Sequence, residues 1–139
     1  MEENVDKVQT IEEHITPDVV QELTEIQLFI DSEYTEDVAV LIPRLTRIGA
    51  YMSRTGYLKA VAESDRDRAM AAVFSEHSKA ILKMPATVST KFIGSQCARE
   101  NYYCTWIDRI NRTCTHQADI IRTQISFAKE DLALTRRGY

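Results

Sequence analysis

A seven-residue repeat of apolar positions organises the second half of the chain. Alternating steps of four and three residues, starting at Ile93, reach twelve positions up to Leu132, and ten of them are apolar. Neither Gly nor Pro interrupts the chain between Gly94 and Gly138. This pattern is typical of a helix that buries one stripe against other helices, and it predicts a helix over about residues 90–136. The seam of this helix comprises Ile93, Cys97, Cys104, Ile107, Asn111, Cys114, Ile121, Ile125 and Leu132.

One polar seam position, Asn111, has two interpretations. A buried Asn fixes the register between paired helices, whereas an Asn at the edge of a seam faces water. The helix also carries a second apolar stripe beside the seam, made of Tyr103, Trp106, Ile110, Ile120, Phe127 and Leu134.

The first part of the chain predicts one short helix. Residues 16–18, Thr-Pro-Asp, form a good helix start, because Thr can cap the helix, Pro fits its first turn and an acid suits its positive end. Apolar residues then share one face up to residue 30, and the helix is predicted to end near residues 31–32. Residues 1–15 lack a sustained apolar repeat, so they are predicted to be disordered or loosely docked.

A second long helix is predicted between residues 36 and 83. Its face begins with Val38, Leu41, Leu45, Ile48 and Met52, at heptad spacing. Pro43 lies inside this face, so the helix either starts at Pro43 or starts near residue 36 and bends. The charged interval 63–68 contains no Gly, Pro or Asn and is interpreted as helix with a solvated face. Residues 85–90 are predicted to form a connector.

These elements predict an all-α fold. Two helices of similar length joined by a short connector favour an antiparallel hairpin over residues 35–139, preceded by an acidic amino-terminal arm, residues 1–34, with one short helix. Seams on two sides of a hairpin need either the amino-terminal helix or other copies of the chain to cover them. We therefore expect a homo-oligomer.

Charge is distributed unevenly along the chain. Residues 1–40 carry twelve acids against one Lys, whereas residues 41–139 carry sixteen Lys and Arg against nine acids, within a net charge of −4. Such asymmetry indicates an anionic partner or docking between the two parts. The sequence has no 18-residue apolar run and no basic-then-apolar amino-terminal segment, so we expect a soluble cytoplasmic protein without a membrane partner.

No catalytic or metal-binding motif is present. The sequence contains no phosphate-binding Gly-rich loop, no nucleophile elbow and no His-Glu-x-x-His, and its three histidines are scattered. Enzymatic activity, a metal site and a cofactor are therefore not expected. All three cysteines lie on the seam and are interpreted as buried reduced thiols, with disulfides between subunits as the alternative.

Basic and aromatic residues provide the candidate binding surface. Arg and Lys recur at seven-residue intervals on the last helix, and the second helix interleaves cations with Tyr. Cations can follow phosphates while rings stack on bases, which is what binding of single-stranded nucleic acid requires. The same residues also fit an ordinary salt-bridged helix surface. The candidates are Arg44, Arg47, Tyr51, Arg54, Tyr57, Lys59, Arg109, Arg112, Arg122, Lys129 and Arg136.

The arrangement of these segments resembles a known family. The similar parts are residues 45–72, which include Tyr51, Tyr57 and Lys59, the run Glu100-Asn-Tyr-Tyr-Cys-Thr-Trp-Ile-Asp108, and residues 115–122 followed by Phe127. In pattern they resemble the UvsY-like recombination mediators of T4-type phages. The resemblance implies a ring-like homo-oligomer that binds single-stranded DNA and helps to load a recombinase onto strands covered by single-strand binding protein.

Two other functions fit the sequence. One is a helical structural or assembly protein, such as a virion, scaffold or adaptor component, whose only chemistry is helix packing. The other is an inhibitor whose acidic arm imitates the phosphates of DNA. For the mediator, we expect the acidic arm to lie over the basic face until DNA displaces it.

Overall fold

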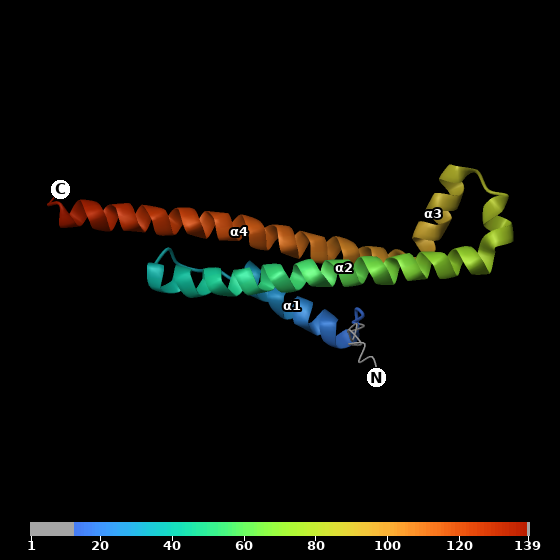
Figure 1. The fold of residues 1–139 in the computed structure, drawn as a ribbon, viewed down its shortest axis with the longest axis horizontal. Helices are drawn as coiled ribbons and strands as arrows, with labels where there is room; N and C mark the ends of the chain where they lie inside the picture. The colour runs from blue at the N-terminus through green and yellow to red at the C-terminus, as the bar shows by residue number, and fades with distance from the viewer. Residues whose placement is uncertain (1–12, 139) are drawn as a thin grey trace, which may run out of the picture.

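The computed structural model describes residues 13–138 and contains four helices, α1 (Pro17–Asp31), α2 (Val38–Leu82), α3 (Ala86–Gln96) and α4 (Ala98–Arg136) (Figure 1). No strand occurs within residues 13–138, so the predicted all-α class is confirmed. The state predicted for residues 1–12 falls outside the described residues. No helix of the described part has a stretch apolar enough to cross a membrane.

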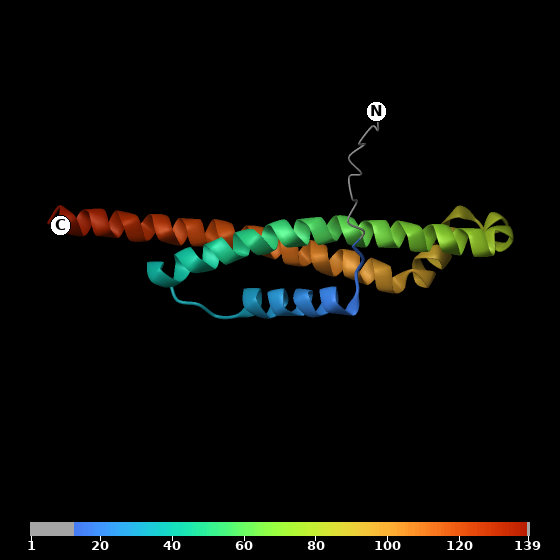
Figure 2. The same cartoon turned by 60° about the horizontal axis from the view of Figure 1, so that its bottom comes forward.

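The two long helices, α2 and α4, lie side by side and run in opposite directions (Figure 1). Turning the molecule shows α1 along one side of this pair, antiparallel to α2 (Figure 2). α4 continues past the beginning of α2, and its last turns project from the end of the molecule. Every residue from 129 to 138 is exposed.

α1 forms as its sequence predicts and is part of the core. Thr16 caps it by accepting a hydrogen bond from the Val19 N–H at 3.3 Å, and Pro17 occupies the first turn. The apolar face of α1 is buried against α2 and α4, with Leu23 and Ile26 almost fully covered. The predicted arm, residues 1–34, therefore includes a helix whose apolar face belongs to the same core as the helices of the predicted hairpin.

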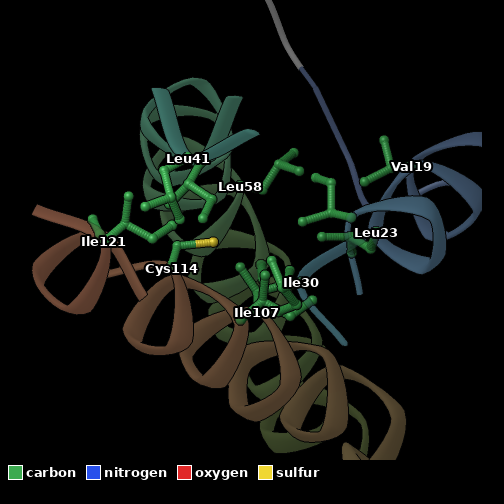
Figure 3. Packing of buried hydrophobic residues seen from close by; sticks show 13 residues of the cluster. Val19, Leu23, Ile30, Leu41, Leu58, Ile107, Cys114 and Ile121 are labelled. Carbon is green, nitrogen blue, oxygen red and sulfur yellow. The ribbon is translucent and has the colours of Figure 1, made fainter. Parts of the chain in front are cut away.

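One apolar cluster connects the three packed helices (Figure 3). Seam residues of α4 lie fully buried at its centre, and Leu41, Ile48 and Leu58 of α2 face them. Asn111 also points inward, and its Nδ2 donates hydrogen bonds to the Met52 carbonyl at 2.9 Å and to the Thr55 hydroxyl at 3.1 Å. Asn111 therefore lies between two paired helices and does not face water, and both helices belong to the same chain.

α2 begins before its proline. Asp37 caps the helix by accepting from the Ala39 N–H at 3.0 Å, so the alternative that the helix starts at Pro43 is wrong. The charged interval 63–68 is helical, as predicted. The backbone departs from helical angles at His77 (φ −113°, ψ 20°), and the end of α2 bends out of line with the rest of the helix toward the connection with α3 (Figure 1).

The predicted connector, residues 85–90, is wrong. The chain forms α3 there and breaks at Cys97 (φ −109°, ψ 27°), so the single helix predicted from Thr90 becomes two, and Ile93 lies on a different helix from the rest of the seam. The break buries Cys97 completely, and Asn101 Nδ2 donates to the Gly94 carbonyl beside it at 3.4 Å. The heptad phase is the same before and after the break, so periodicity could not reveal it.

The packing of α1 can be tested with two leucines of that helix. Leu23 is fully buried, whereas Leu28 is 67% exposed. Leu23→Ala should lower the free energy of unfolding by about 2–5 kcal/mol, because it removes buried methyl groups and leaves a cavity. Leu28→Ala should change it by less than about 0.5 kcal/mol. Urea unfolding followed by circular dichroism measures both, and equal effects would show that α1 is not part of the core.

Candidate nucleic-acid interface

The predicted cations lie on two opposite sides of the α2–α4 pair. On α4, Trp106 faces α1, and its Nε1 donates to Gln27 Oε1 at 3.0 Å. Residues two apart on a helix point about 200° apart. Accordingly Asp108 faces away from α1, where it accepts a hydrogen bond from Lys59 Nζ at 2.9 Å. One side of the pair therefore carries α1, and the other carries an open groove.

On the side of α1, Arg44 joins the helices to one another. Its side chain is buried, with Nη2 donating to the Phe29 carbonyl at 3.0 Å and to Gln117 Oε1 at 3.1 Å. The rings of Phe29 and Tyr34 lie over the guanidinium, with centroids 4.5 and 4.2 Å from Cζ. Burial lowers the pKa of Arg44, but a guanidinium stays charged at neutral pH. Because its donors are used within the chain, this buried position does not favour a role in nucleic-acid binding, and that role stays a prediction.

Arg54 is likewise committed to the amino-terminal segment. It forms ion pairs with Glu13 and Glu22, each with a shortest distance of 2.7 Å. The hydrogen bond from Arg54 lowers the pKa of Glu13, and hydrogen bonds to both carboxylates, first that of Glu22, raise the pKa of Arg54. The same segment is held by Asp65, which contacts His14 Nδ1 at 2.7 Å. The acidic segment thus covers one predicted cation.

The remaining predicted residues of this side are Arg47, Tyr51 and Tyr57. Arg47 Nε donates to the Tyr51 hydroxyl at 2.8 Å, and the Tyr51 ring meets the Phe29 ring edge-on at a centroid distance of 5.4 Å. The Tyr57 ring lies 5.9 Å from Arg54 Cζ. Tyr51 therefore packs against α1, whereas the Tyr57 side chain is 44% exposed beside Arg54.

On the opposite side, the structure brings cations of two helices together. A groove of about 440 Å³ between α2 and α4, here called the α2–α4 groove, is lined by four cations and two carboxylates, with Cys104 and Thr105 between them. The cations are Lys59, Arg66, Arg109 and Arg112, and the carboxylates are Glu63 and Asp108.

Asp108 organises the groove. One carboxylate oxygen accepts from Lys59, and the other lies 3.0 Å from Arg112 Nε. The hydrogen bond from Lys59 is the main reason why the pKa of Asp108 is lowered, and the same bond raises the pKa of Lys59. Arg109 has no ion pair within residues 13–138, so the groove keeps an excess of positive charge.

Further cations of α4 continue this side of the helix. Arg122, Lys129 and Arg136 follow Asp108 at multiples of seven residues, so they lie on a face that drifts by only about 20° per heptad, and successive cations are about 10 Å apart. Arg122 contacts Asp119 at 3.1 Å, while Lys129 and Arg136 are exposed and form no ion pair with the described residues. Together with the groove they form the cationic track, defined as Lys59, Arg66, Arg109, Arg112, Arg122, Lys129 and Arg136.

Arg66 is the member of the track that the sequence prediction missed. It lies seven residues after Lys59 and contacts Asp67 at 3.3 Å. The heptad spacing from Lys59 was the signal that could have found it, but the run of alternating charges in residues 63–68 concealed it.

The seam residues differ in their surroundings. Cys97, Ile107, Cys114 and Ile121 are fully buried, and Ile93, Cys104, Asn111 and Ile125 are partly buried. Leu132 lies on the projecting end of α4 and is 54% exposed. The three cysteines are free thiols, and burial raises the pKa of each. Within the described residues, no group of three or more His, Cys, Asp or Glu side chains could hold a metal ion.

Comparison with protein families, with curated proteins and with solved structures finds no match to this chain.

The ion pairs of Asp108 can be tested by titration. Lys59→Met should raise the pKa of Asp108 toward the ordinary value of about 3.9, because it removes the main stabilising hydrogen bond. The pKa of Asp108 is lower in the folded than in the unfolded chain. The ion pair therefore contributes its full stability at pH values above the unfolded pKa. It is lost as the pH falls through the folded pKa.

Carbon-13 NMR of the Asp108 carboxyl group measures this shift. Lys91→Met, which removes one Lys from α3, should leave the pKa of Asp108 unchanged. An equal shift in both variants would mean that general charge and not the Lys59 contact sets this pKa.

Proposed function

We propose that this chain binds single-stranded DNA along the cationic track and acts as a self-associating accessory protein of recombination. The observation that supports this best is the α2–α4 groove, where four cations from two helices face only two carboxylates. The three cations that follow on α4 extend the same charge to the end of the helix.

The chemistry of the track favours contacts with phosphates over contacts with bases. Arg and Lys side chains neutralise phosphates without regard to sequence, and released counterions drive binding. No aromatic side chain lines the α2–α4 groove, and the predicted tyrosines lie on the side of α1. Binding should therefore depend strongly on salt and only weakly on base sequence.

The track is accessible without movement of α1. Residues 13–34 do not cover the groove, because Glu13 and His14 contact Arg54 and Asp65 on the other side of the helix pair. DNA that binds in the groove would therefore not need to displace residues 13–34. Deleting those residues would instead remove the buried face of α1.

The assignment to recombination rests on the resemblance to UvsY-like mediators. In this proposal the track holds single-stranded DNA in an assembly of several copies, and the assembly presents that DNA to a recombinase. The recombinase and the single-strand binding protein would be partners of the assembled form.

The proposal predicts that the affinity for single-stranded DNA depends on salt and falls when groove cations are removed. Arg109→Gln combined with Arg112→Gln should weaken binding of a labelled oligo-dT by at least about tenfold at low salt. The slope of log K against log salt should become shallower by about 0.7 for each phosphate that the variant no longer neutralises. Asp108→Asn should strengthen binding, because it removes a carboxylate from the groove. Fluorescence anisotropy measures all three affinities.

A charge-matched control separates the groove from net charge. Lys79→Gln combined with Lys91→Gln removes two cations outside the track, so the affinity should fall much less than in the groove variant. Equal losses in the two double variants, or no salt-dependent binding by the unaltered chain, would contradict the proposal.

A second function is favoured by a different observation. Large apolar side chains are exposed on the projecting end of α4, among them Phe127 and Leu134. Exposed apolar residues gathered on one element mark an interaction surface. A helical assembly protein without DNA binding would show a mass above 15.9 kDa in light scattering and no oligo-dT binding at any salt concentration.

A further inference from the structure

An apolar stripe on α4 runs beyond the part that α1 covers. Trp106, Thr113, Ile120, Phe127 and Leu134 occupy one heptad position, so they lie along one side of the helix. α1 covers the beginning of this stripe at Trp106 and ends before its last three residues. These three are 52%, 61% and 49% exposed, respectively.

A pocket of about 500 Å³ lies at the junction of α1 and α2. Its apolar walls include Phe29, Tyr34, Val40 and Pro43, and Val40 is itself exposed. A cavity of this size and composition can hold a large apolar side chain. The charged residues of its lining are the cations Arg44 and Arg47 and the carboxylate Glu33.

The charges of the stripe and of the pocket are complementary. Glu130 and Asp131 lie three or four residues from both Phe127 and Leu134, so both acids flank the stripe. Neither acid forms an ion pair with the described residues. In the pocket, Arg47 is exposed and donates its hydrogen bond to a neutral group, the Tyr51 hydroxyl, so its charge stays available.

We propose that this pocket receives Phe127 of a second copy of the chain, with Leu134 packing beside it and Glu130 and Asp131 facing Arg47. The inference deepens the proposed self-association and rests on it. The contact joins two different surfaces of the chain, so each copy offers both a stripe and a pocket.

This contact leaves the cationic track open. Lys129 and Arg136 each lie two residues after a residue of the stripe, which places them about 200° around the helix. A copy that inserts its Phe127 into a neighbour therefore still exposes these cations. The same end of α4 can serve assembly on one side and nucleic acid on the other.

Light scattering after gel filtration tests the contact on the full chain. The unaltered chain should have a mass of several times 15.9 kDa. Phe127→Asp combined with Leu134→Asp should reduce it to that of a single chain, and Val40→Glu in the pocket should do the same. Leu82→Asp is the matched control, because Leu82 is 76% exposed near the opposite end of the molecule, and it should leave the mass unchanged.

Charge reversal tests the partners of the contact. Arg47→Glu should raise the concentration of half-dissociation by at least about tenfold, and Glu130→Arg with Asp131→Arg in the same chain should restore it, because the pair is then reversed. A single-chain mass for the unaltered protein, or an unchanged mass for both the stripe and the pocket variants, would overturn the inference. So would a failure of the reversed charges to restore association.

The same variants separate this inference from DNA binding. The stripe variant should keep its affinity for a short oligo-dT, because the α2–α4 groove is unaltered, while the groove variant should keep its mass. A stripe variant that keeps its mass while the groove variant binds more weakly would reject the docking contact alone. The opposite result would reject the DNA proposal alone.

Discussion

The arrangement of the three packed helices depends on a polar contact centred on Arg44. The last carbonyl groups of any helix lack partners within that helix, and α1 has no basic residue in its last turn. Arg44 of α2 supplies donors to this end of α1, and Gln117 of α4 donates to the Ile30 carbonyl at 2.6 Å. One buried cation therefore ties α1 to both long helices and closes the apolar cluster at this end. A buried guanidinium without these oxygen acceptors would be costly, which makes the contact specific for one position of α1.

The placement of α1 also decides which cations are available to other molecules. The acids of residues 13–40 do not neutralise the basic body uniformly. Glu13 and Glu22 neutralise Arg54 on one side, while Lys59 and Arg112 on the other side share the single carboxylate of Asp108. The uneven charge along the sequence thus becomes an uneven charge across the helix pair. The packing of α1 thus covers one side of the α2–α4 pair and leaves the opposite side cationic.

The lengths of the helices have a second consequence. α4 passes the beginning of α2, so its apolar stripe and its cations continue where no other part of the described chain can cover them. The stripe and the cations lie on different sides of that projecting end. An assembly built through the stripe would therefore leave the cations at the end of α4 exposed on each copy.

The sequence alone determined the class of the fold and most of its core, because heptad spacing is a local property of each helix. It predicted the helix across residues 63–68, the cap at Thr16 and the buried face of α1. It could not show that Cys97 breaks the last helix, since the apolar phase is the same on both sides of the break. Nor could it separate the buried Arg44 from the exposed cations, since neighbours from three helices decide the role of each arginine. Tertiary packing made that decision by bringing Phe29, Tyr34 and Gln117 to Arg44, and Asp108 to Lys59, across distances in sequence that no local pattern spans.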